Sequence, residues 1–299
     1  MLVTDPIRWP LEAIWQAVEP HLPGFTCEVL PIIDSTNSEL MRRMKAGQSV
    51  PTLLVAERQS AGRGRLGRHW HSQRGDSLTF SLGLPLAPAD WSGLSLAVGV
   101  SLAESLDVAN LDGQRIALKW PNDLWLSQSN HAGRKEGKLA GVLVETANIG
   151  GQRCVVVGVG INVGISVGID VVTDVSTNLV TNAGIAVGTN ALNRDFKPES
   201  ALRVRSAGLQ ELFSDADVAG VLGLVVPPLA QSLLAFERLG FAPFQARFAQ
   251  RDVLAGREVQ LSDGTRGTAR GITKTGSLLV HTLAGMKEIT SSEVSVRPC

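Results

Sequence analysis

The chain has 299 residues, which allows one large domain and a smaller appendage. Hydrophobic residues make up 44% and charged residues 19%, and the 28 basic residues balance the 28 acidic ones, which excludes a disordered tail or a polybasic nucleic-acid binder. Three widely spaced cysteines, Cys27, Cys154 and Cys299, favour free thiols in a reducing compartment, so we expect a cytoplasmic protein. The N-terminus lacks a basic segment followed by an apolar run, so we predict no signal peptide. Polar residues interrupt the later valine-rich stretches, so we predict no membrane span.

The first elements alternate between helix and strand. Apolar side chains at helical spacing predict a helix over Trp9–Val18, which is too short for a DNA-reading helix-turn-helix domain. A strand over Val29–Ile33 follows, and Thr36 with Glu39 three residues later is a capping-box pattern that predicts the start of a helix. Leu53–Glu57 is a short buried strand that leads into a loop rich in glycine and arginine.

The middle of the chain predicts one helix and three strands. Ser77–Leu84 alternates as a strand, and Leu94–Leu106 has apolar residues at helical spacing. Arg115–Trp120 and Leu139–Glu145 are predicted strands, and the polar stretch Ser127–Gly137 between them has the composition of a loop.

A central strand and a second helical region follow. Cys154–Val163 is an apolar run whose glycines let another backbone or a ligand approach closely. The stretch Gly164–Asn193 has no clear period and receives no assignment. Ser214 with Asp217 is another capping-box pattern, which predicts a helix that Pro227-Pro228 interrupts.

From Arg251 onward the pattern changes to short strands joined by turns, which predicts a small β-barrel. We therefore expect a large α+β domain over residues 1–250 and a small domain over residues 251–299.

The segment Gln59–Trp70 carries the strongest functional signal, because three glycines alternate with Arg63, Arg65 and Arg68 in it. Glycine permits backbone conformations closed to other residues, and arginine offers a planar, permanently charged fork to carboxylate and phosphate oxygens. This composition predicts a loop that closes over an anionic ligand, although a flexible surface loop or an RNA-binding arginine cluster has the same composition. It is not a Walker A loop, because no Gly-Lys-Ser/Thr sequence ends it.

Two further motifs adjoin predicted strands. A proline directly before Asn122 and Asp123 suggests a turn that projects both side chains from a buried scaffold, where the carboxylate could orient a cation, a ribose or an attacking amine. A turn that these residues merely close is the alternative. Lys138 precedes an apolar run and offers a compact positive charge to an α-phosphate or a carboxylate, and a solvated strand end is the alternative there.

Other patterns exclude particular kinds of site. Val157–Val163 contains Gly-x-Gly but neither the third glycine nor the helix of a dinucleotide fingerprint, although Asn162 could still bind a base. His69 and His71 lack the further ligands that a zinc site needs, so we predict no metal site built from protein side chains.

Five segments in chain order resemble the biotin-protein ligases, of the monofunctional type without an N-terminal DNA-binding domain: residues 34–37, 62–68, 119–123, 138–145 and 160–162. The resemblance spans residues 30–165, with a weaker similarity in the C-terminal barrel. It implies an α+β fold, in which a mixed-sheet catalytic domain similar to class II aminoacyl-tRNA synthetases occupies residues 1–250 and an SH3-like β-barrel occupies residues 251–299.

The family's reaction has two steps, in which biotin and Mg-ATP give biotinyl-5'-AMP and pyrophosphate and a carrier lysine then takes the biotin. The resemblance implies ATP and Mg²⁺ as cofactors, biotin as substrate, and the biotin carboxyl carrier protein of acetyl-CoA carboxylase as the usual partner. It implies no nucleic-acid partner and no repressor activity, no membrane partner, and a monomer or weak homodimer.

The resemblance also implies roles for individual residues. Catalysis would depend on Arg65, on Lys138 beside the reacting carboxylate and α-phosphate, and on Asp123 beside the incoming lysine. The residues implied in biotin binding are Ser35, Thr36, Asn37, Gln59, Gly62, Arg63, Gly64, Arg65, Lys138 and Gly141. Those implied in nucleotide binding are Arg65, Arg68, Trp70, Asn122, Lys138 and Asn162.

Two rival functions stay open on the sequence. A lipoate-protein ligase shares the fold, but it should not carry the Gly-Arg loop together with Lys-Trp-Pro-Asn-Asp. A non-catalytic nucleotide or RNA binder would use the same arginines and would bind RNA with a strong dependence on salt.

Overall fold

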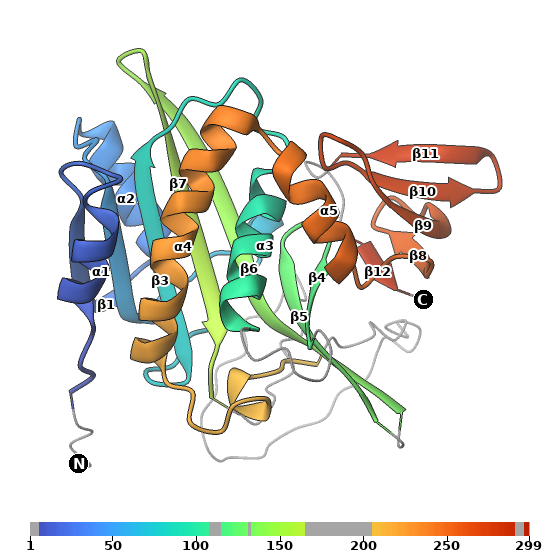
Figure 1. Ribbon diagram of the computed structural model, residues 1–299, viewed down its shortest axis with the longest axis horizontal. Coiled ribbons are helices and arrows are strands. Elements are labelled where there is room, and N and C mark those ends of the chain that lie inside the picture. Colours follow the sequence, from blue (N-terminus) through green and yellow to red (C-terminus); the bar gives the residue numbers. More distant parts are fainter. Residues whose placement is uncertain (1–5, 108–114, 131–132, 165–204, 291–295, 299) are drawn as a thin grey trace, which may run out of the picture.

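Two sheets organise the computed structural model, which describes residues 6–107, 115–130, 133–164, 205–290 and 296–298 (Figure 1). The seven strands of the large sheet lie in the order β1-β2-β3-β7-β6-β5-β4, and only the pair β1 and β2 is parallel. Its strands are β1 (Thr26–Ile33), β2 (Thr52–Gln59), β3 (Ser77–Pro85), β4 (Ile116–Lys119), β5 (Asp123–Asn130), β6 (Gly133–Ile149) and β7 (Gln152–Asn162).

The second sheet, called the C-terminal sheet below, is antiparallel with the order β11-β10-β9-β8-β12. Its strands are β8 (Glu258–Leu261), β9 (Arg266–Ile272), β10 (Leu278–Thr282), β11 (Gly285–Ile289) and β12 (Val296–Pro298). The predicted α+β class, with a mixed sheet followed by a small β domain, is confirmed. The predicted boundary at residue 251 falls on the last residue of the helix before this sheet.

Helices cover both faces of the large sheet (Figure 1). On one face lie α1 (Leu11–Val18), α3 (Leu94–Leu106) and α4 (Val218–Leu239), and α5 (Ala242–Arg251) packs against α3. On the other face lies α2 (Thr36–Lys45). Because side chains alternate along a strand, Leu53 and Val55 enter the main core whereas Leu54 packs with Leu40 and Met44 of α2.

The predicted loop over Ser127–Gly137 is wrong, because strands β5 and β6 continue through it as a hairpin. Ser127 pairs with Glu136, and Gln128 pairs with Lys135. The polar composition hid these strands, since their charged side chains bind partners elsewhere in the chain: Lys135 binds Glu211, and Glu136 binds Arg257.

Both predicted helix caps shift by one or more residues. Ser35, not Thr36, caps α2, because its hydroxyl accepts from the amide of Ser38 at 3.4 Å, while the amide of Thr36 donates to a side chain of β2. Asp217, not Ser214, caps α4, and its carboxylate accepts two backbone amides at 2.9 Å. The nearest side-chain acceptor to each helix start therefore takes the capping position.

Helix α4 runs uninterrupted through Pro227-Pro228, contrary to the prediction. The prolines lie on the less buried side, and Leu224, which precedes Pro228 by one turn, is 45% exposed, so its carbonyl can face water. The opposite side of α4 is buried against α1 and α3, which stabilises the helix despite the missing amides. By length and composition alone α4 could span a membrane, and 44% of its most apolar window is buried inside the protein.

Several polar contacts join α5 and the C-terminal sheet to α3 and to the large sheet. The buried Arg251 pairs with Asp107 at 2.9 Å and donates to the carbonyl of Ile116 at 2.8 Å. The indole of Trp120, fully buried, donates to the carbonyl of Gly276 at 2.9 Å. The segment before Asn122 and Asp123 is thus held by α5 and the C-terminal sheet.

Asp252, at the end of α5, makes stability depend on pH. Burial raises the pKa of its carboxyl to about 6, above the unfolded value near 4, so folding takes up a proton between these pH values and stability falls as pH rises through them. We predict that the free energy of unfolding of Asp252→Asn, measured relative to that of the parent, is higher at pH 7.5 than at pH 4, by up to about 3 kcal/mol. Denaturant unfolding at both pH values measures it.

The matched control is Asp90→Asn, since Asp90 accepts the amide of residue i+2 as Asp252 does but is exposed. An Asp252→Asn effect that is equal at the two pH values would contradict the explanation.

Candidate functional site

The glycine- and arginine-rich loop folds back on itself as a narrow hairpin after β2. The amide of Trp70 donates to the carbonyl of Gly62 at 2.9 Å, and the amide of Gly64 donates to Arg68 at 2.7 Å. A Cβ on Gly62 would lie 2.3 Å from the carbonyl oxygen of Trp70, so only glycine fits there. At the tip, Leu66 has φ 55°, a left-handed conformation that costs about 1–2 kcal/mol for a residue with a Cβ.

This loop covers a cavity of about 570 Å³, within the range typical of small-molecule sites. The loop forms one wall, with Arg63, Arg65 and Arg68 among its lining residues, and Asp34, Ser38 and Leu143 lie opposite. The predicted anion-binding loop therefore borders an open cavity at the N-terminal end of α2.

The arginines of the loop point to different partners. Arg65 is partly buried, and its guanidinium donates to Oδ1 of Asn122 at 3.1 Å. Burial lowers the pKa of Arg65 from its ordinary value. The negative charge of Asp123 raises this pKa and the positive charge of Arg68 lowers it further. Arg63 is half-exposed and pairs with Glu145 at 2.8 Å. Arg65 therefore holds a charge that water stabilises only in part, whereas the charge of Arg63 is already neutralised.

The start of α2 and the sheet beneath it form a polar cluster. Oε1 of Gln59 accepts from both the amide and the hydroxyl of Thr36, at 2.7 and 3.2 Å. The buried hydroxyl of Ser81 lies 2.7 Å from Oγ1 of Thr36 and 2.5 Å from Oδ1 of Asn37. The predicted residues Ser35, Thr36, Asn37 and Gln59 thus come together.

Asn37 connects this cluster to the loop. Its amide donates to the carbonyl of Leu143 at 3.2 Å and to Glu145 at 3.0 Å, and Glu145 binds Arg63. A Cβ on Gly158 of β7 would lie 2.0 Å from Oδ1 of Asn37. The side chain of Asn37 therefore lies directly on the β7 backbone.

A second group of predicted residues lies where β5 and β6 meet. The ammonium of Lys138 and a carboxylate oxygen of Asp123 are 2.7 Å apart, a close ion pair whose geometry is not that of an aligned hydrogen bond. Asn122 donates to the carbonyl of Val142 at 2.8 Å, and Asn162 donates to the carbonyl of Lys138 at 3.3 Å.

Trp70 lies over this second group. A Cβ on Gly160 would approach its indole ring to 2.3 Å, and one on Gly141 would lie 3.6 Å from it, so both glycines make room for the ring. The ammonium of Lys138 lies 6.0 Å from the ring centroid. The indole nitrogen of Trp70 is buried and finds no hydrogen-bond partner within the described residues.

Two residues of the polar cluster were missed by the sequence analysis, Ser81 and Glu145. Ser81 is a buried hydroxyl on β3, as Thr79 is, and such a position signals a polar partner. Glu145 ends the motif that begins with Lys138, and a carboxylate closing an apolar strand was the available signal. The glycines of β7 were expected to admit another backbone or a ligand, whereas in the structure the side chains of Asn37 and Trp70 lie on them.

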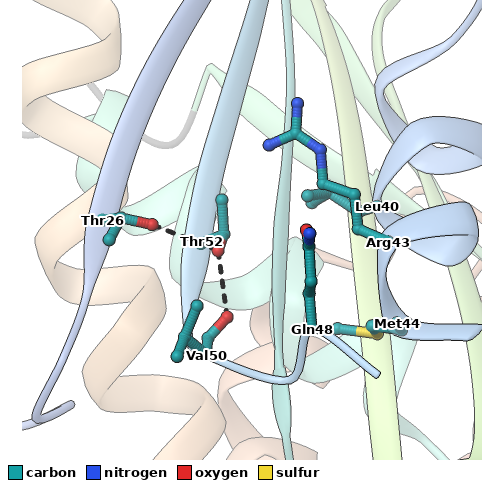
Figure 2. Close-up of a pocket in the computed structure, with 7 residues that line it drawn as sticks. All are labelled: Thr26, Leu40, Arg43, Met44, Gln48, Val50 and Thr52. Atoms are coloured by element: carbon teal, nitrogen blue, oxygen red, sulfur yellow. Dashed lines mark hydrogen bonds between the residues drawn. The ribbon is translucent and has the colours of Figure 1, made fainter. Parts of the chain in front are cut away.

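A smaller cavity of about 200 Å³ lies at the other end of α2 (Figure 2). The hydroxyl of Thr52 donates to the carbonyl of Val50 at 2.9 Å, and Arg43 pairs with Glu28 and Glu39. Since Thr52 and Arg43 already have protein partners, this cavity carries no assignment. No group of three or more potential metal ligands exists among the described residues.

Comparisons with known proteins agree on the family. The Biotin/lipoate A/B protein ligase family matches residues 29–162, and the Biotin protein ligase C terminal domain matches residues 255–297. The Bifunctional ligase/repressor BirA of Escherichia coli K12 is 33% identical over 286 residues, covering 93% of this chain and 76% of that protein. The chain belongs to the biotin protein ligase family.

Other relatives of this family match nearly end to end. A Biotin--[acetyl-CoA-carboxylase] ligase of Paracoccus denitrificans is 29% identical over 269 residues, which cover 87% of this chain and 96% of that enzyme. The structure of a biotin protein ligase from Aquifex aeolicus in complex with biotin and ATP superposes with a TM-score of 0.66 at 29% identity, covering 92% of this chain and 99% of that one. The resemblance stated from the sequence is confirmed.

The tight contact between Gly158 and Asn37 predicts a stability effect. Gly158→Ala should lower the free energy of unfolding by about 1–3 kcal/mol, because the added methyl group displaces Asn37. Denaturant unfolding measures it.

Gly220→Ala in the first turn of α4 is the matched control, since its Cβ would have no neighbour closer than 3.6 Å and alanine favours helix. If both variants were as stable as the parent, Asn37 would not be held against β7.

Proposed function

We propose that the chain activates biotin with ATP to biotinyl-5'-AMP and transfers it to a lysine of a biotin carboxyl carrier protein. The observation that carries the proposal is that Arg65, which lines the loop cavity, binds Asn122 next to the ion pair of Asp123 and Lys138. Relatives named as biotin ligases, one of them seen with biotin and ATP, support the substrates. A reducing compartment, the cytoplasm, suits the free thiols of Cys27 and Cys154.

Charge is the chemical problem of the first step. A carboxylate attacks the α-phosphate and displaces pyrophosphate, so two anions must be brought together. Fixed donors aimed at the developing charge are worth about 3 kcal/mol each. Arg65 and Lys138 are such donors, and partial burial makes the charge of Arg65 responsive to an anion.

The second step needs a free amine. The acceptor lysine attacks the carbonyl carbon of the mixed anhydride, AMP leaves, and the amine loses a proton. Asp123 would position this lysine and receive its proton once Lys138 turns from Asp123 to the ligand. The present distance of 2.7 Å between them makes this exchange of partners local.

The other predicted residues surround these reacting groups. We assign Ser35, Thr36, Asn37 and Gln59 to the ring system of biotin, and Gly62, Gly64 and Gly141 to the close approach of backbone to it. Trp70 would cover the adenylate, and its buried indole nitrogen offers the ligand a donor. Arg68, Asn122 and Asn162 would hold the nucleotide, and Arg63 would meet the carboxylate after leaving Glu145.

Mg²⁺ would arrive with the triphosphate rather than in a cage of side chains. The described residues hold no cluster of metal ligands, and Mg²⁺ commonly binds through substrate phosphates and water. Its chemistry when bound would be to neutralise phosphate charge.

The identity of the acid distinguishes this proposal from lipoate ligation. Purified protein is mixed with Mg-ATP, a carrier domain and either biotin or lipoate, and the carrier is weighed by mass spectrometry. We expect the biotinyl mass alone. A lipoyl mass without a biotinyl one, or RNA binding without pyrophosphate release, would refute the proposal.

Arg65→Gly should let the intermediate escape. The adenylate still forms, but the loop loses its bond to Asn122, and hydrogen bonds of charged groups are worth about 1.5–3 kcal/mol, so biotinyl-AMP should dissociate about 10-fold to 100-fold faster. Release of biotinyl-AMP into a filtrate measures it.

Leu66→Gly gives the loop the same glycine freedom but keeps the guanidinium, so it should retain more of the intermediate than Arg65→Gly. Equal retention by Arg65→Gly and the parent would show that the loop is not a lid.

Lys138→Ala should suppress the first step about 100-fold to 1000-fold, because the developing charge loses its fixed cation. Biotin-dependent pyrophosphate release measures this rate. Lys287→Ala, which removes an exposed ion pair with Asp263 in the C-terminal sheet, serves as control. Unchanged pyrophosphate release in Lys138→Ala would refute the role.

A further inference from the structure

Lys138 lies on β6 just beyond the point where the neighbouring strand β7 ends. The first residue of β6 that pairs with β7 is Ala140, opposite Ile161, and β7 ends at Asn162. On the other side of β6, the register with β5 shifts between Leu124 and Trp125, which is a β-bulge. A bulge can re-aim a side chain, and because β7 does not reach Lys138, the backbone of Lys138 needs another partner on that side.

A separate segment, residues 205–207, supplies that partner. The amide of Lys138 donates to the carbonyl of Arg205 at 2.8 Å, and the amide of Ala207 donates to the carbonyl of Lys138 at 2.9 Å. A Cβ on Gly137 would lie 2.6 Å from Nη1 of Arg205 and 2.9 Å from Cβ of Ala207. The segment therefore packs directly against the backbone of β6 and hydrogen-bonds both the backbone amide and the backbone carbonyl of Lys138.

Glu211 holds this segment in place. Its side chain is 9% exposed, and it accepts from Lys135 at 2.8 Å, from the amide of Gly208 at 3.1 Å and from the guanidinium of Arg205. Burial opposes its ionisation, but Lys135, Gly208 and Arg205 together lower the pKa of Glu211 below its usual value. The carboxylate thus joins β6 to the segment through two cations.

We propose that Arg205, Glu211 and Lys135 form a positioning cluster that aims the ammonium of Lys138 at the reacting carboxylate and α-phosphate. The inference rests on the proposed function of Lys138. None of the three touches the reacting atoms in this role. They fix the backbone from which Lys138 extends, and a displacement of about 1 Å at a catalytic group can cost about 100-fold in rate.

The neighbouring residue on β6 offers a matched control. Glu136 also makes a partly buried carboxylate ion pair, with Arg257 at 2.8 Å, but this pair leads to the C-terminal sheet and not to residues 205–207. Glu136→Gln and Glu211→Gln therefore remove the same charge within the same region, and only the second loosens the partner of Lys138.

The experiment compares the parent, Glu211→Gln and Glu136→Gln in three measurements. Biotin-dependent pyrophosphate release reports the first step, transfer from supplied biotinyl-AMP to the carrier domain reports the second, and thermal unfolding reports the fold. We expect Glu211→Gln to lower the maximal rate of the first step about ten-fold with little change in the biotin concentration at half-maximal rate. Transfer from supplied biotinyl-AMP should change much less, and Glu136→Gln should retain the parent rate of the first step.

The double variant that combines Arg205→Gln with Glu211→Gln should catalyse the first step no more slowly than Glu211→Gln alone, because both residues belong to the same positioning cluster. A parent rate in Glu211→Gln would overturn the inference, and so would an equal loss in Glu136→Gln or an equal loss in both steps. A parent enzyme that releases no pyrophosphate with biotin would instead refute the proposed function.

Discussion

Positive charge held partly away from water is the constraint on which the site depends. Arg65 comes from a loop and Lys138 from a strand, and the carboxylate of Asp123 acts on both charges. Asn122, in the segment between β4 and β5, accepts a hydrogen bond from Arg65, and the adjacent Asp123 pairs with Lys138 at 2.7 Å. The buried contact between Trp120 and Gly276 ties this segment to the C-terminal sheet, so both domains contribute to where the two cations lie.

Glycines on the large sheet make room for the side chains of the site. Gly158 and Gly160 on β7 let Asn37 and Trp70 lie on the backbone, and Gly141 on β6 gives the same ring more room. Polar residues at the start of α2 are buried and hydrogen-bonded to Gln59 and Ser81 of the sheet, which fixes their orientation before any ligand binds. The family membership and this geometry support one account, in which rigid strands position the reacting groups and the loop encloses them.

The sequence predicted the elements whose patterns are local. Apolar runs revealed β2, β3 and β7, and the ordered motifs revealed the family. The hairpin of β5 and β6 was not predicted, because its polar strands are stabilised by Glu211 and Arg257, which lie far away in the chain. Thr36 was a plausible cap by spacing, but the side chain of Gln59 takes its amide, and only the fold brings the two together. The role of residues 205–207 as the strand partner of Lys138 has no sequence signal at all.

Isotope exchange between pyrophosphate and ATP in the absence of carrier protein tests the central claim most directly, because it requires that the site form the mixed anhydride reversibly and retain it. The account predicts that labelled pyrophosphate enters ATP when biotin is present and does not when biotin is omitted. Exchange that proceeds equally without biotin, or its absence while the carrier becomes biotinylated, would contradict the account.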